Sequence, residues 1–163
     1  MFFMAEMTDA EVMGVVKRAF GDVQRPEHFT NYKHCDECWE HDEELAARDL
    51  DTLSIEDVGN MGWNPITFAT PEAFAYYMPA LARLALEPVP KERDWYGYII
   101  LFELRRNGPR NERWSYCSPE QRASVIQLIE HLYSTRTEEL KTYDCANDVM
   151  EVLEIWSDVG AAG

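Results

Sequence analysis

The residues of this chain best suited to chemistry lie in one short stretch, His-Cys-Asp-Glu-Cys-Trp-Glu-His at positions 34–41. It holds two of the four cysteines and two of the four histidines. Thiol and imidazole groups can bind a metal ion, take part in redox chemistry or act in nucleophilic catalysis. The stretch therefore predicts a functional cluster, and its spacing and neighbours help to separate these three kinds of chemistry.

A metal site is the first hypothesis. If the stretch is helical, His34, Cys38 and His41 share one face, because each residue turns a helix by about 100°. Cys35 lies one turn before Cys38, so Cys35, Cys38 and His41 can converge on a tetrahedral ion, with His34 as an alternative ligand. Zinc prefers these donors, and the neighbouring carboxylates would orient the histidines.

The pattern is weaker than that of a zinc finger, because no second pair of cysteines or histidines follows at a fixed spacing. The alternative interpretation is structural. In that case Cys35 and Cys38 are small, partly buried residues near a helix start, and His34 and His41 face water.

A redox dithiol or a thiol-dependent enzyme is a further hypothesis. The position of Cys35 and Cys38 near a helix start favours it. The acidic neighbours Asp36, Glu37 and Glu40 argue against it, because they are expected to raise the pKa of a nearby thiol. No strand-helix-strand pattern precedes the cysteines, as it does in thioredoxin-like proteins.

The charge of the chain is strongly negative, with a formal net value of −15. Ten acidic residues and one arginine lie between positions 36 and 57, and a second acidic segment covers 138–158. Such a field disfavours nucleic acids and anionic membranes and favours a basic protein partner. The predicted partner-binding residues are six acidic side chains of the first segment: Asp36, Glu37, Glu40, Asp42, Glu43 and Glu44.

The length of 163 residues predicts one domain covering positions 1–163. Hydrophobic residues make up 46% of the chain, as is typical of a globular protein. No apolar run approaches the roughly 18 to 20 residues that span a bilayer, and the apolar start lacks the basic residues of a signal peptide. We therefore expect a cytoplasmic protein, with reduced cysteines and no membrane contact.

The pattern of apolar residues and capping signals predicts an all-α fold, a single-domain bundle of five or six helices. Thr8, Thr70 and Ser118 are typical residues before a helix start. The segment Trp95–Arg106 has the composition of a buried strand, but its helical stripe favours a helix. The expected helices cover about 9–20, 35–48, 71–85, 95–106, 119–132 and 137–157, with a short helical turn at 54–57.

Several segments resemble a family of small bacterial proteins of unknown function. They cover positions 25–30, 34–43, 63–65 and 70–74, and the second of them reads HCDECWEHDE. The resemblance implies a bacterial origin, and it transfers no activity, cofactor or catalytic residue.

Common catalytic motifs are absent, including those of phosphate-binding loops, serine hydrolases and zinc proteases. The sequence therefore favours a non-enzymatic, acidic interaction protein. Its most specific form is a bacterial immunity or inhibitor protein that neutralises a basic toxin such as a nuclease, since complementary charge speeds association. A zinc-binding domain and a small thiol-dependent enzyme remain the alternatives.

Overall fold

The computed structural model describes residues 6–157, and within them it contains nine α-helices, two 3-10 helices and no β-sheet. The predicted all-α fold is confirmed. The elements are α1 (Asp9–Phe20), α2 (Asp36–Ala46), α3 (Ile55–Val58), η1 (Pro65–Phe68), α4 (Pro71–Leu86), α5 (Tyr96–Arg105), η2 (Gly108–Arg110), α6 (Glu112–Tyr116), α7 (Pro119–Thr135), α8 (Thr137–Thr142) and α9 (Ala146–Trp156).

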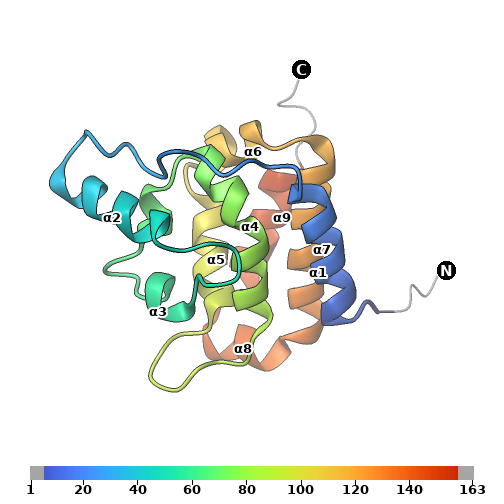
Figure 1. Ribbon diagram of the computed structural model, residues 1–163. Helices are drawn as coiled ribbons and strands as arrows, with labels where there is room; N and C mark the ends of the chain where they lie inside the picture. Colours follow the sequence, from blue (N-terminus) through green and yellow to red (C-terminus); the bar gives the residue numbers. More distant parts are fainter. Residues whose placement is uncertain (1–5, 158–163) are drawn as a thin grey trace.

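Five helices form the body of the molecule. Each contacts two neighbours in the order α1, α4, α5, α9, α7 and back to α1, so they close into a ring around one hydrophobic core. Amphipathic helices can bury their apolar stripes together in this way. Figure 1 shows these helices side by side, with α2 and α3 projecting from one side of the bundle.

The predicted helix starts are correct where a capping residue marks them. The Thr8 and Ser118 side chains each accept the backbone N–H three residues on, in complete capping boxes, and Thr70 caps α4 in front of a proline. The ambiguous segment at Trp95 is also helical, as α5. Its buried residues recur at helical spacing, which confirms the preference for helix over strand.

The number of helices exceeds the predicted five or six. The expected helix at 137–157 is two helices, because Asp144 has a left-handed backbone (φ 47°) that interrupts the chain between α8 and α9. The short helix α6 was not predicted at all. Asn111 starts it by accepting two backbone N–H groups, a cap that lies outside any apolar run.

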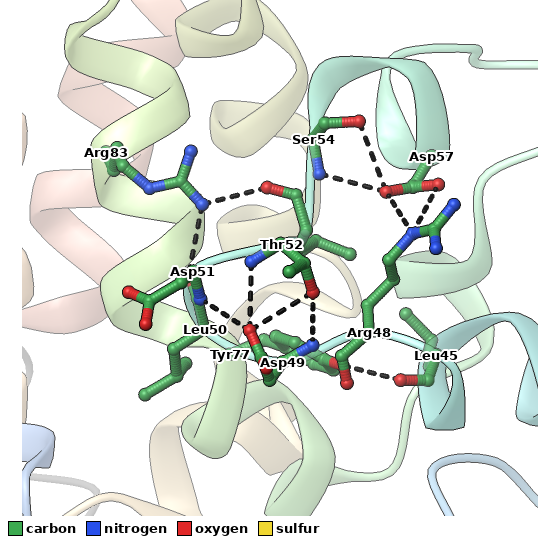
Figure 2. A network of polar contacts seen from close by, with 11 residues as sticks. Leu45, Arg48, Asp49, Leu50, Asp51, Thr52, Ser54, Asp57, Tyr77 and Arg83 are labelled. Atoms are coloured by element: carbon green, nitrogen blue, oxygen red, sulfur yellow. Dashed lines mark hydrogen bonds and ion pairs between the residues drawn. The ribbon is translucent and has the colours of Figure 1, made fainter.

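The segment between α2 and α3 is tied to the bundle by polar contacts (Figure 2). The Tyr77 hydroxyl of α4 lies 2.8 Å from the Arg48 carbonyl oxygen, and Arg83 donates to the carbonyls of Leu50 and Leu53. Asp49 accepts backbone N–H groups within the loop itself. These contacts pair the carbonyl groups of a partly buried loop, and they fix the C-terminal end of α2 against α4.

None of the helices within residues 6–157 has the length and apolarity that a membrane span requires.

Candidate metal centre

The cysteine and histidine cluster lies at the N-terminus of α2. The helix begins at Asp36, one residue later than predicted, because Cys35 is its N-cap with an extended backbone. The Cys35 sulfur accepts the backbone N–H of Cys38 at 3.4 Å, in the position that a serine or aspartate oxygen usually takes. This cap folds the side chain of Cys35 back over the first turn of the helix.

Three side chains of the cluster converge. The Sγ atoms of Cys35 and Cys38 are 3.2 Å apart, and Cys38 Sγ lies 3.7 Å from His34 Nδ1. All three candidate ligand atoms lie within 4.8 Å of one another. Cys38 is buried, whereas His34 and Cys35 are exposed. The group is therefore open to solvent on one side and backed by the protein on the other.

These distances suit a zinc ion with little movement. Zinc–sulfur bonds of about 2.3 Å and a zinc–nitrogen bond of about 2.0 Å imply roughly 3.8 Å between two sulfurs and roughly 3.5 Å between sulfur and nitrogen in a tetrahedral site. The separation of Cys38 and His34 already matches. The two sulfurs would have to move apart by about 0.6 Å, which a rotation of the exposed Cys35 side chain can provide.

His41, which the sequence placed among the ligands, is not in this group. Its ring is fully buried, stacks on Phe68 at a centroid distance of 4.7 Å and lies against the tilted ring of Trp63 at 4.2 Å. Glu37 and Glu44 lie 3.4 and 3.5 Å from its two ring nitrogens. The structural alternative, in which His41 faces water, is wrong for the same reason. His34 is the histidine that joins the two cysteines.

The pKa values of the two thiols are shifted in opposite directions. The pKa of Cys35 is lowered, chiefly by the backbone N–H of Cys38 and further by a hydrogen bond with His34. The pKa of Cys38 is raised by its hydrogen bond with Cys35, by burial and by the charge of Glu37. The expectation that the acidic neighbours raise the thiol pKa therefore holds for Cys38. It is wrong for Cys35, whose capping position outweighs them.

The predicted partner-binding acids do not all reach the surface. Asp36, Glu37, Glu40 and Glu43 are exposed and Glu44 is half-buried. Asp42 is buried, where it accepts the backbone N–H groups of Phe29 and Thr30 and pairs with His28 at 2.9 Å. Its carboxylate holds the segment before α2 in place and is not available to a partner.

The surface beside α2 carries two partly exposed aromatic residues. Trp63 and Phe68 are each 36% exposed. They cover His41, and Trp63 donates its indole N–H to Glu44 at 2.8 Å. We call Glu37, Glu44, Trp63 and Phe68 the acidic-aromatic surface. Its only sequence signal is the glycine- and proline-containing loop around Trp63, since loops often carry binding residues.

Fold and cluster together define an all-α protein with a histidine and two cysteines placed so that they can hold a metal ion. Residues 8–159 match the model of a family described as a family of unknown function (DUF6714), and the chain belongs to this family. The expected membership in a family of unknown function is thus confirmed. No significant match was found among curated proteins or among solved structures.

Proposed function

We propose that this protein binds a zinc ion through His34, Cys35 and Cys38. The observation that carries the proposal is the convergence of their three ligand atoms within 4.8 Å. One imidazole and two thiols are the donor set that zinc favours, and three protein ligands leave a fourth position for water or for a ligand from a partner. A cytoplasmic location is part of this proposal, because a reducing compartment keeps both thiols available.

Metal reconstitution tests the zinc site. The purified, reduced chain is expected to bind about one equivalent of zinc, with release of protons because the thiols must ionise. Cobalt in place of zinc should give thiolate charge-transfer absorption and the visible bands of a tetrahedral ion. Both signals should fall sharply in His34→Ala, Cys35→Ser and Cys38→Ser.

Two matched substitutions control for loss of a histidine or a cysteine elsewhere. His28→Gln changes a histidine that contacts Asp42 rather than the cluster, and Cys117→Ala changes a buried cysteine of another element. Both variants should keep the full metal signal. Less than a tenth of an equivalent of zinc in the unaltered chain, with no loss of stability in chelator, would contradict the proposal.

We propose a second function for the acidic-aromatic surface, the binding of a basic protein segment. The supporting observation is that two part-exposed aromatic rings and two carboxylates gather around His41. Aromatic faces attract arginine and lysine side chains, and carboxylates add charge-assisted hydrogen bonds. The net charge of −15 would speed the encounter. A bacterial inhibitor of a basic toxin is the most specific form of this function.

Binding to an arginine-rich peptide tests this surface. The affinity is expected to fall with added salt and to drop about tenfold in Trp63→Ala and in the double variant Glu37→Gln, Glu44→Gln. The matched control is Glu138→Gln, Glu139→Gln, which removes the same charge from α8. An equal loss in the control would show that only net charge matters, and it would overturn the assignment to this surface.

A further inference from the structure

The sulfurs of Cys35 and Cys38 are neighbours but differ in access to solvent. Cys35 is exposed, whereas Cys38 is 6% exposed. Their Sγ atoms lie 3.2 Å apart, and the backbone N–H of Cys38 holds the Cys35 sulfur over the first turn of α2. A disulfide bond is about 2.05 Å long, so the atoms must approach by only about 1.2 Å to form one.

We propose that Cys35 and Cys38 form a dithiol that exchanges with disulfides, with small disulfides such as oxidised glutathione as the substrate class. The exposed Cys35 sulfur is the only one of the pair that an incoming molecule can reach freely. Cys38, behind it, is placed to attack the adduct. This activity does not require a bound metal and goes beyond the proposed zinc site.

The exchange takes two balanced steps. Ionised Cys35 attacks one sulfur of oxidised glutathione, so that the glutathione S–S bond breaks, a mixed disulfide forms and one glutathione thiolate leaves. Cys38 then loses its proton to water and attacks the Cys35 sulfur, which expels the second glutathione thiolate. The protein pair is oxidised by two electrons, glutathione disulfide is reduced to two thiols, and the leaving thiolates take up the two protons.

The same geometry confines the exchange to this pair. Cys117 and Cys145 are 4% and 0% exposed and lie elsewhere in the fold, directly after α6 and directly before α9. Neither sulfur is hydrogen-bonded to another cysteine among the described contacts, so neither has a partner placed as Cys38 is. The remaining thiols should therefore stay reduced while the pair cycles.

A disulfide between Cys35 and Cys38 also removes both thiolates from the metal group. Oxidation and zinc binding must then exclude one another, and this consequence rests on the proposed function. Zinc should slow the oxidation of the pair, and oxidation should release zinc that is already bound.

Incubation of the full chain in mixtures of reduced and oxidised glutathione tests the exchange. After acid quenching, the intact mass should fall by two hydrogen atoms, and peptide mapping should place the disulfide between Cys35 and Cys38. Cys38→Ser should accumulate a glutathione adduct on Cys35, because the second step is lost. Cys35→Ser should show neither product, and Cys117→Ser should behave as the unaltered chain.

The outcomes separate the exchange from the zinc site. A disulfide that forms at the same rate with and without zinc supports the exchange and contradicts the proposed function. A chain that binds zinc but stays reduced in excess oxidised glutathione after metal removal overturns the exchange alone. An adduct that forms on Cys35 in the unaltered chain and is not resolved by Cys38 also overturns it.

Discussion

At the scale of single residues, the first turn of α2 sets the chemistry of two thiols that are three positions apart. Cys35 caps the helix and accepts a backbone N–H, which lowers its pKa. Cys38 lies inside the turn, where its hydrogen bond with Cys35 is the main cause of a raised pKa, and burial and the charge of Glu37 add to it. The number of acidic residues nearby therefore does not predict the pKa of each thiol. A backbone N–H that bonds directly to the sulfur has a larger effect on the pKa than the more distant carboxylates.

This difference predicts the order of thiol labelling. At neutral pH, iodoacetamide should modify Cys35 about tenfold or more faster than the other cysteines, because the thiolate is the reacting form. Cys117 should react last, since burial raises its pKa to about 12. Peptide mass spectrometry over time measures the order. In denaturant the four labelling rates should become similar. Equal labelling rates in the native chain would contradict the prediction that Cys35 is the most reactive thiol.

At the scale of elements, η1 is held on the bundle by a buried ion pair. Arg113 of α6 lies 2.7 Å from the Glu103 carboxylate of α5 and also donates to the Ile66 carbonyl. Thr67 donates to the other Glu103 oxygen at 2.6 Å. Each charged group is thereby satisfied, which a buried pair requires, and the contacts fix the element that ends in Phe68.

Breaking this pair should destabilise the fold strongly. Arg113→Met removes the nearest positive charge from the fully buried carboxylate of Glu103, which keeps only the Thr67 hydroxyl and the more distant Arg106 at 3.8 Å. The expected loss is about 3–5 kcal/mol in urea unfolding. The control is Arg105→Met on α5, whose partners Asp148 and Glu151 are partly exposed, with an expected loss below about 1 kcal/mol. Similar losses of unfolding free energy in both variants would show that the buried ion pair contributes no more to stability than the partly exposed one.

At the scale of the whole molecule, ion pairs join parts of the chain that are far apart in sequence. Asp9, at the start of α1, contacts His131 at 2.7 Å and Arg136 at 2.9 Å, at the far end of α7. The hydrogen bond from Arg136 is the main cause of the lowered pKa of Asp9, and His131 adds to it. These two ion pairs therefore join the N-terminal end of α1 to the C-terminal end of α7.

The lowered pKa of Asp9 predicts how stability depends on acid. A carboxyl with a lowered pKa in the folded chain contributes stability above its ordinary value of 3.8, and this contribution is lost as the pH falls through the lowered pKa. Asp9→Asn should reduce stability at pH 7 and flatten its decline in acid. Thermal unfolding between pH 7 and pH 2 measures both effects, with the exposed Asp22→Asn as control. An unchanged acid slope in Asp9→Asn would contradict the role of this pair.

Much of the architecture could be predicted because its signals are local. Capping residues before α1, α4 and α7 and the apolar stripe of α5 lie within the segments that they define. The break at Asp144 and the helix α6 could not be predicted. Each depends on a single residue whose backbone or cap is set by the surrounding fold, with no change in the apolar pattern.

The sequence by itself determined that Cys35 and Cys38 lie one turn apart near a helix start, because residues three positions apart on a helix are neighbours whatever the rest of the chain does. It predicted His41 as the third ligand, with His34 as the alternative. Only the tertiary structure decided which of the other predicted residues can still bind a metal ion or a partner. Trp63 and Phe68 cover His41, and the backbone N–H of Phe29 donates a hydrogen bond to the Asp42 carboxylate. Burial depends on contacts with distant segments, and a local spacing carries no information about them.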